Sequence, residues 1–205
     1  MNYSTLAFSA ASKSFQTIAG SRKAYERMDQ EHTDGLSSHE TDFIGTRDGF
    51  YMSTIGENGF PYIQFRGGPK GFLKVLDRDK LGFVDFRGNK QYISAGNLMT
   101  NKKAALFFMD YASQTRLKIY AEAELVELKD NPQLFKKLTL TDYKYHPERM
   151  MVFKVLTFSW NCPQHITPRY TVSEMQDALA EQHAYIEKLE TELKDLKDGK
   201  KHSAR

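Results

Sequence analysis

The sequence predicts a mainly β protein with flanking helices, built around an antiparallel split β-barrel. Seven short runs rich in β-branched and aromatic residues lie between Phe50 and Trp160, and most are joined by short polar turns. The segment 116–125 alternates between apolar and polar residues, which is typical of a strand with one buried face. Because parallel strands need long crossover connections, these turns favour an antiparallel barrel over a parallel doubly wound sheet.

The N-terminal third is predicted to be helical. Residues at near-helical spacing from Phe15 to Met28 predict one amphipathic helix that lies on an apolar surface. A loop at 29–40 then leads into a short helix through Ile44. Its candidate capping residues are Ser37, Ser38, Glu40 and Thr41.

Strand signals begin at Gly49. Two β-prone runs meet at the turn 56–59, and two more meet at a polar turn from Asp77 to Lys80, so we expect two hairpins. The later elements are expected as a helix at 96–106, strands at 104–111 and 116–127, a helical insert at 131–138 and a last strand at 149–160.

The C-terminal segment has a different period. Its seam residues recur alternately four and three positions apart, which is a heptad pattern with charged flanks: Met175, Leu179, Gln182, Ile186, Leu189, Leu193 and Leu196. This amphipathic helix either packs on its own barrel or forms a short coiled coil between two copies, and we favour self-association. We therefore expect a helical arm at 1–39, the barrel domain at 40–170, and the heptad helix with a solvated tail at 171–205.

Composition limits the class of protein. The 205 residues are 40% hydrophobic and 13% aromatic, which suffices for a sizeable core, and no apolar run is long enough to span a membrane. The single cysteine, Cys162, excludes an intrachain disulfide framework, and the first residues lack a secretion signal, so we expect a cytoplasmic protein. A net charge of +3 is too small to indicate nucleic-acid binding.

Basic and small residues gather where two strands end. Arg66 precedes a glycine-rich bend, while Lys90 and Ser94 lie at the next strand exit, before the expected helix. A phosphate dianion needs about two cationic donors together with hydroxyl or backbone N–H groups, so the two segments would suit one anion. Lysines at turns, such as Lys70, are usually only solvated. Lys74 shares a strand face with apolar residues and would be a costly inward cation without an anionic partner.

These residues also carry a family resemblance. The segment Asp42–Glu127, with FPYIQFRGGPKGFLKVLD, GFVDFRGNKQYISAGNL and MDYASQTRLKIYAEAELVE, resembles the pyridoxamine 5′-phosphate oxidase-related flavoproteins, which have the FMN-binding split-barrel fold. SWNCPQHITPRY is similar to the C-terminal flavin-proximal segment of one branch. The resemblance implies FMN at the interface of a homodimer, and a flavin-dependent oxidoreductase with a small-molecule redox substrate or electron donor.

The resemblance also implies individual cofactor contacts. Lys74 resembles a strand lysine near the flavin ring or phosphate, and Lys90, Gln91 and Ser94 resemble phosphate ligands at the head of a helix. Residues implied to come from the partner subunit include Arg116, Trp160, Gln164 and His165, of which His165 is the candidate proton donor or acceptor. Alternatively, His165 stacks on or hydrogen-bonds the ring. The implied cofactor-binding set is Arg66, Lys74, Lys90, Gln91, Ser94, Asn97, Arg116, Trp160 and Gln164.

The sequence departs from the oxidase itself at its C-terminal end. The oxidase has an arginine-leucine-histidine type signature that helps hold the vitamin's phosphate, whereas this chain continues as ITPRYTVSEMQ into the heptad helix. We therefore expect flavin binding without oxidation of pyridoxamine phosphate. The alternative from another class is a flavin or haem carrier or sensor without turnover, and the fold also includes deazaflavin-using members.

Other residues with possible chemistry have simpler interpretations. Cys162 and His165 are three apart, a spacing that suits a thiolate nucleophile or half a metal site, but a buried cysteine beside Trp160 is favoured and no metal site is expected. Asp85 and Asp110 end strands, where a carboxylate either acts as an acid or base or, more commonly, hydrogen-bonds a turn.

Overall fold

The computed structural model describes residues 2–28, 35–160 and 163–202, which form two compact units. The first unit contains the described residues up to Asp110 and from Gln114 to His165. The second contains Tyr111–Ser113 and the described residues from Ile166 onward. The candidate site described below lies within the first unit.

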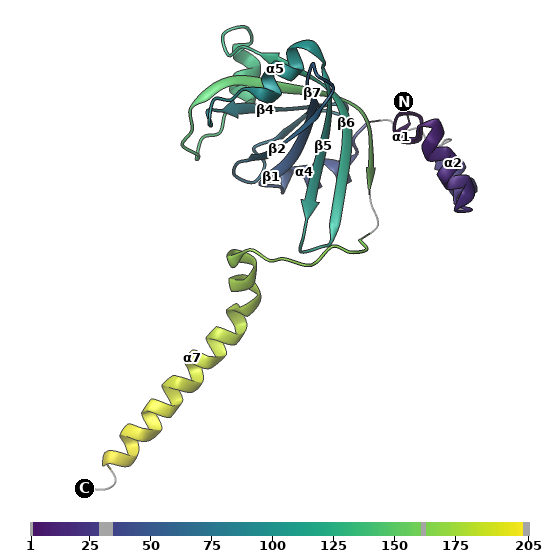
Figure 1. Cartoon of the computed structure of the whole chain (residues 1–205). Coiled ribbons are helices and arrows are strands. Elements are labelled where there is room, and N and C mark those ends of the chain that lie inside the picture. Colours follow the sequence, from purple (N-terminus) through teal and green to yellow (C-terminus); the bar gives the residue numbers. More distant parts are fainter. Residues whose placement is uncertain (1, 29–34, 161–162, 203–205) are drawn as a thin grey trace. The chain divides into compact units, whose positions relative to one another are not determined.

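The first unit is built on one antiparallel sheet with strand order β2-β1-β5-β6-β7-β4-β3 (Figure 1). The strands are β1 Gly49–Ile55, β2 Pro61–Gly67, β3 Lys74–Asp77, β4 Lys80–Phe86, β5 Lys103–Asp110, β6 Thr115–Val126 and β7 Pro147–Trp160. The sheet curls until Arg66 on edge strand β2 reaches Asp85 on β4, which neighbours the other edge strand, with Nη1 and Oδ1 2.6 Å apart. The predicted fold class, a split barrel with flanking helices, is confirmed.

The strands follow the turn chemistry of the sequence. The β1–β2 hairpin closes at Gly56–Gly59, where the Gly59 N–H donates to the Gly56 carbonyl and Gly59 has φ +80°, a conformation that glycine adopts without strain. β3 and β4 form the second predicted hairpin. The pairing of β4 with β7 joins segments about 65 residues apart in the chain, and local turn signals did not predict it.

An aromatic cluster fills the barrel. Phe50 stacks on Phe72 and Phe108 with ring centroids 5.8 and 5.2 Å apart, and meets Phe83 edge-on at 5.8 Å. Phe83 in turn stacks on Phe153 at 6.1 Å. All five rings are buried. Such pairs add about 0.5–1.5 kcal/mol each beyond the burial of their area, so the core fixes how β1, β4, β5 and β7 meet.

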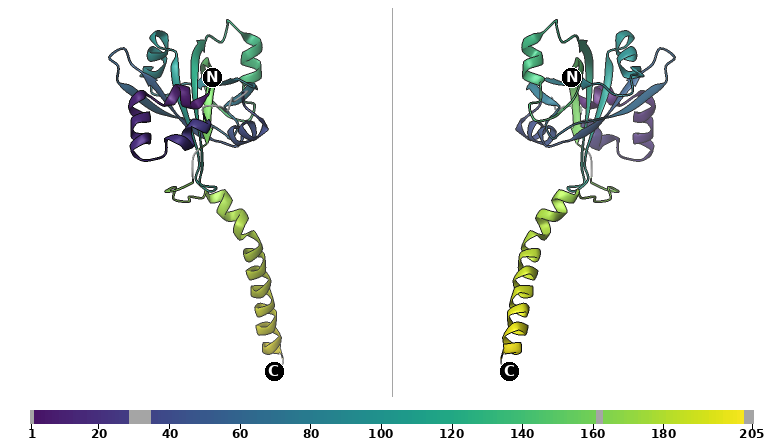
Figure 2. Two further views of the ribbon diagram at one scale, coloured as in Figure 1. Left: turned by 90° about the vertical axis from the view of Figure 1, so that its right-hand side faces the viewer. Right: turned by 90° about the vertical axis from the view of Figure 1, so that its left-hand side faces the viewer.

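Helices flank the sheet. Their bounds are α1 Tyr3–Ala7, α2 Ala10–Ile18, α3 Arg22–Met28, α4 Ser38–Gly45, α5 Ile93–Thr100 and α6 Pro132–Leu138. Figure 2 shows α1 and α2 on one side of the barrel and α6 on the opposite side. The short helix predicted through Ile44 is confirmed as α4, with Ser37 as N-cap and Glu40 completing the capping box. The helical insert predicted at 131–138 is confirmed as α6, capped by Asn131.

Two helix predictions were wrong in their bounds. The single N-terminal helix is broken at Gly20, which has φ +72°. Its first half does not lie on an apolar surface, because Phe15 and Ile18 are 73% and 80% exposed. The helix expected at 96–106 begins earlier, at Ile93, and ends at Thr100. Lys103 onward pairs with β6 instead, so strand pairing outweighs the local helical pattern there. Residues 29–34 of the predicted loop lie outside the described residues.

The second unit contains the 31-residue helix α7, Val172–His202. Its N-terminus is a capping box, since the Glu174 N–H donates to Thr171 Oγ1 and the Thr171 N–H donates to Glu174 Oε2. The predicted C-terminal helix is therefore confirmed, and it begins three residues before Met175. The Leu196 side chain of the predicted seam lies outside the described residues. Within the ranges that the structure describes, no helix has the length and apolar character needed to cross a bilayer.

Candidate functional site

A polar cavity of about 280 Å³ lies where the barrel is split, between β2, the end of β4 and the start of α5. The strand exit that the sequence marked as an anion site forms much of its wall. The lining residues are Gln64, Arg66, Asp85, Phe86, Gly88, Asn89, Lys90, Tyr92, Ser94, Ala95 and Glu148. We call it the α5 cavity.

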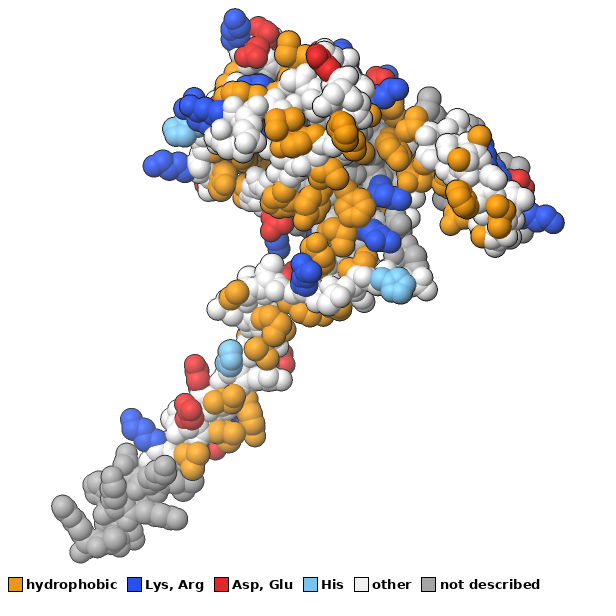
Figure 3. Space-filling view, in the orientation of Figure 1, with side chains coloured by type: hydrophobic (Ala, Val, Ile, Leu, Met, Phe, Trp, Pro, Cys, Tyr) orange, Lys and Arg blue, Asp and Glu red, His pale blue; other side chains and the backbone are white. Residues whose placement is uncertain are grey.

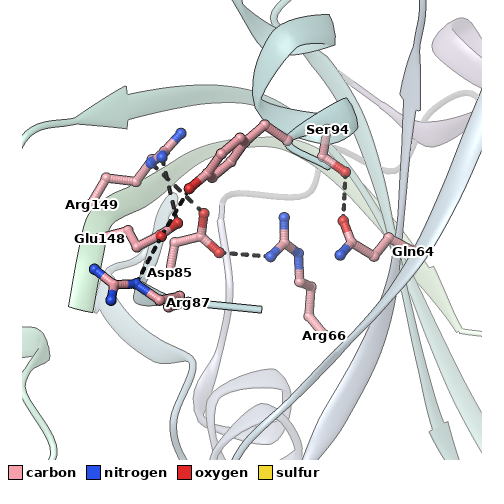
Figure 4. Close-up of polar contacts among 8 residues, drawn as sticks. Gln64, Arg66, Asp85, Arg87, Ser94, Glu148 and Arg149 are labelled. Atoms are coloured by element: carbon pink, nitrogen blue, oxygen red, sulfur yellow. Dashed lines mark hydrogen bonds and ion pairs between the residues drawn. The ribbon is translucent and has the colours of Figure 1, made fainter. Parts of the chain in front are cut away.

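A buried ion pair forms the floor of the α5 cavity (Figure 4). The Arg66 and Asp85 side chains are only 14% and 7% exposed, and Arg149 Nε lies 4.0 Å from the other oxygen of Asp85. Burial raises the pKa of the Asp85 carboxyl, and the attraction of Arg66 and Arg149 offsets this only in part. Asp85 therefore holds two guanidinium groups in place.

A second acidic group, Glu148, lines the cavity beside Asp85. Its Oε1 accepts a hydrogen bond from Tyr92 OH at 3.0 Å and lies 3.3 Å from Arg87 Nε, and its Oε2 lies 3.6 Å from Arg149 Nη2. The Arg149 guanidinium also lies over the Tyr92 ring, 5.0 Å from its centroid. The hydrogen bond to Glu148 raises the pKa of the Tyr92 hydroxyl, so Tyr92 remains a neutral donor.

The start of α5 offers free donors to the cavity. Lys90 and Tyr92 have φ +60° and +53°, and Tyr92, the N-cap residue, provides no side-chain hydrogen bond to the first turn. Ser94, in that turn, is buried and its Oγ donates to Gln64 Oε1 at 2.9 Å. The backbone N–H groups of an uncapped first helical turn and the positive end of the helix dipole both favour negative charge, so this wall is suited to an anion.

Charge supports the same assignment. Two cationic side chains, Arg66 and Lys90, line the cavity, and two more, Arg87 and Arg149, lie against its two carboxylates, Asp85 and Glu148, so the group has four cations and two anions. A doubly charged anion would balance this excess. No cluster of three or more potential metal-binding side chains occurs within residues 2–28, 35–160 and 163–202.

A second cavity, of about 600 Å³, lies between α5 and the β1–β2 turn. Its wall combines aromatic and polar groups, among them Phe60, Tyr62, Asn58 and Asn97. Asn97 Nδ2 donates to Thr54 Oγ1 at 3.0 Å. Asn97 thus lines the second cavity and not the α5 cavity.

The structure brings together only part of the predicted cofactor-binding set. Arg66, Lys90 and Ser94 line the α5 cavity, whereas Gln91 is exposed and lines neither cavity. Lys74 points elsewhere, because its Nζ donates to the carbonyls of Lys137 and Thr139 at the C-terminal end of α6, at 2.8 and 3.3 Å. These carbonyls, at the negative end of a helix, stabilise the cation that the sequence suggested would need an anionic partner.

The residues assigned to the partner subunit lie outside both cavities. Arg116 is half-buried on β6, and its Nε lacks a hydrogen-bond partner. Trp160 is engaged within its own chain, since Nε1 donates to Glu40 Oε1 at 2.7 Å and its ring contacts His39 and Phe43 of α4. Gln164 and His165 are exposed. Their roles at a shared site stay predictions, and the environment predicted for Cys162 lies outside the described residues.

Sequence reasoning missed several residues of the α5 cavity. Gln64, Tyr92 and Glu148 were not singled out, nor was Arg149, which lies against the two carboxylates of the lining. Asp85 was expected more commonly to hydrogen-bond a turn but instead pairs with arginines. Asp110 likewise pairs with Arg47, at 2.9 Å. The missing signal is the β4–β7 register, which places Asp85 directly opposite Arg149. Without that register, a carboxylate and an arginine 64 positions apart cannot be matched from the sequence.

The barrel and its anion-suited cavity define a split-barrel protein with a candidate phosphate site. The sequence model of the pyridoxamine 5′-phosphate oxidase family matches residues 36–157. These residues include every strand of the sheet except the end of β7. The chain belongs to this family, and the predicted family resemblance is confirmed.

Solved structures are similar at low sequence identity. HupZ of Group A Streptococcus is 15% identical, with a TM-score of 0.45 over 66% of this chain and 99% of that one. An FMN-binding protein of Syntrophomonas wolfei is 16% identical, with a TM-score of 0.46 over 71% and 97%. A protein of Clostridium acetobutylicum related to general stress protein 26 is 16% identical, with a TM-score of 0.41 over 67% and 94%. No curated protein matched the sequence.

Proposed function

We propose that this protein binds FMN with the phosphate in the α5 cavity and, as a homodimer, acts as a flavin-dependent oxidoreductase. The observation that carries the proposal is the grouping of the Arg66 and Lys90 cations with the uncapped start of α5 around one cavity. Membership in the family supports a flavin as the source of the phosphate.

The residues present fit a phosphate monoester. Lys90 supplies an exposed charge, Arg66 supplies a buried one, and the uncapped first turn of α5, where Ser94 lies, supplies backbone N–H groups. Asp85 holds the Arg66 guanidinium in place, so little side-chain entropy is lost when the anion binds. When bound, the flavin accepts and returns electrons through its ring, while the chain supplies anchoring and orientation.

A second copy of the chain is proposed to complete the site. The α5 cavity, at about 280 Å³, is smaller than pockets that enclose a ligand of this size, so the ring would extend beyond it. The outward face of β1 and β2 exposes Tyr51, Ile55, Ile63 and Phe65 next to one another, and Figure 3 shows hydrophobic side chains gathered over this part of the barrel. Contiguous exposed apolar area of this kind is typical of an interaction surface.

Binding assays with two ligands test the anchoring. Lys90→Ala is expected to weaken FMN binding by about 1.5–3 kcal/mol, or about 10- to 150-fold, because a charge-assisted contact to phosphate is lost. Riboflavin, which lacks the phosphate, should bind both proteins alike. Lys80→Ala, at the exposed first position of β4, is the matched control and should leave the FMN affinity unchanged.

Lys74→Ala separates the two placements of the phosphate. A loss of FMN affinity in Lys74→Ala but not in Lys90→Ala would support the strand-lysine assignment made from the sequence and would overturn the α5 cavity. The expected result is the reverse, because the Lys74 ammonium already has two carbonyl acceptors.

Turnover distinguishes the enzyme from a carrier. A flavin-loaded protein that is reduced by a nicotinamide donor and rapidly reoxidised by an acceptor supports the oxidoreductase. Tight binding without redox exchange supports a carrier or sensor. A haem band in the absorption spectrum of the purified protein, in place of flavin peaks, would contradict the FMN assignment.

A further inference from the structure

Helix α7 carries an apolar stripe that its own unit leaves uncovered. Met175, Ile186, Leu189 and Leu193 are 44%, 50%, 39% and 54% exposed. In Figure 3, hydrophobic side chains follow one another along the helix between charged ones. The stripe is narrow, since apart from Tyr185 its large apolar side chains take only two positions of each seven. A helix lying on a membrane surface has a broader apolar face, so this seam favours a helical partner.

The heptad positions specify what kind of partner fits. Counting Val172 as an a position places Leu179, Ile186 and Leu193 at a, and Met175, Gln182 and Leu189 at d. The central heptad therefore has a β-branched residue at a and leucine at d, the combination that favours parallel two-stranded coiled coils.

We infer that α7 pairs with α7 of a second copy as a parallel, in-register, two-stranded coiled coil, and that Gln182 sets its register. In this arrangement the two Gln182 side chains lie in one layer. A carboxamide has both donors and acceptors, so each amide satisfies the other. In an antiparallel pair each d residue faces an a residue, and with full overlap of the seam Gln182 would face Ile186 and lose its partner.

The flanking residues permit this pairing. In a parallel pair, a g residue lies next to the e residue of the following heptad in the partner helix, which brings Ala178 near His183 and Tyr185 near Glu190. Neither combination places like charges together. The ion pair between Lys188 Nζ and Glu192 Oε1, 4.0 Å apart, lies within a single helix and is compatible with either state.

Disulfide trapping in the full chain tests the inference. In a Cys162→Ser background, Leu189→Cys places one thiol in the proposed seam, and Thr191→Cys places one on the opposite, outer face as a matched control. Mild oxidation at micromolar protein should give at least about ten-fold more covalent dimer from Leu189→Cys than from Thr191→Cys. Equal yields from the two variants would overturn the coiled coil and would favour a helix packed on its own chain or on a membrane.

Orientation is tested by mixing two variants with different tags. In a parallel pair the Met175→Cys thiol lies far from the Leu193→Cys thiol of the other chain, so we expect only disulfides between identical variants. In the full-overlap antiparallel pair the two thiols lie in one layer and would form a heterodisulfide. Abundant heterodisulfide would overturn the parallel orientation. The cross-linking readout needs no flavin, so a failure of the proposed FMN site would leave it unaffected. Conversely, Leu189→Lys with Leu193→Lys should abolish the coil while the barrel retains its flavin.

Discussion

Replacing Arg66 with methionine would test whether the Arg66–Asp85 pair closes the barrel. The substitution keeps much of the side-chain volume but leaves the 7%-exposed Asp85 carboxylate with only Arg149, whose Nε is 4.0 Å away and beyond hydrogen-bond distance. Removing one member of a buried ion pair costs about 3–5 kcal/mol. For a chain of this length, that loss lowers the Tm by about 6–20 °C.

The pH dependence of this loss gives a second readout. Burial raises the pKa of Asp85 above its usual value of 3.8 even with Arg66 present, and removal of Arg66 raises it further because a cation that lowers it is lost. In the unfolded chain the Asp85 carboxyl has its ordinary pKa. The charged carboxylate therefore lowers the free energy of unfolding of the variant at pH values above the raised folded-state pKa. As the pH falls through that pKa, the carboxyl becomes neutral and the penalty shrinks.

Urea unfolding at neutral pH and at about pH 4–5 measures both effects. Arg87→Met is the control, because Arg87 is half-exposed in its pair with Glu148 and should contribute only about 0–1 kcal/mol. Combining Arg66→Met with Asp85→Asn should recover more than half of the loss, since no unpaired carboxylate remains. A loss below about 1 kcal/mol for Arg66→Met, or one that grows as the pH falls, would refute the reasoning.

Two further predictions concern the core and α4. Burial alone raises the pKa of Glu40, but hydrogen bonds from Ser37 and Trp160 outweigh it, so the folded-state pKa lies below 4.5. The stabilisation of the fold by the charged Glu40 carboxylate is present above its unfolded-state pKa. It is lost as the pH falls through the lowered folded-state pKa. Glu40→Gln should thus cost about 1–2 kcal/mol in urea unfolding at pH 7 and almost nothing in strong acid; equal losses at both would contradict it. Gly68→Ala would place a Cβ 2.7 Å from Cγ of the buried Phe72 ring and should destabilise by about 1–3 kcal/mol in thermal unfolding. Gly45→Ala, with no atom within 4 Å, is the control and should be neutral or stabilising by up to about 1 kcal/mol.

Elements whose cause is local were predictable from the sequence. The turn at Gly56–Gly59, the capping box of α4 and the alternation of 116–125 each depend on residues within a few positions of one another, and all three are present. The heptad period of α7 is local in the same sense. The strand exit with Lys90 and Ser94 was also recognised as an anion site from its residue types, and both residues line the α5 cavity.

Helix bounds were less predictable where neighbours compete. The run after Thr100 has helical spacing, but hydrogen bonding of Lys103–Asp110 to β6 satisfies its backbone more completely than one further helical turn would. In the N-terminal segment, a periodic pattern continued across Gly20, whose left-handed φ breaks the helix.

The sequence by itself determined the fold class, the order of the strands along the chain and one basic wall of the candidate site. Only the tertiary structure decided which charges meet. It directs Lys74 to the carbonyls at the end of α6, Trp160 to Glu40, and Arg66 across the split to Asp85. The physical reason is that turns, caps and periodic faces depend on near neighbours, whereas the partner of a buried charge depends on strand order and register across the whole sheet.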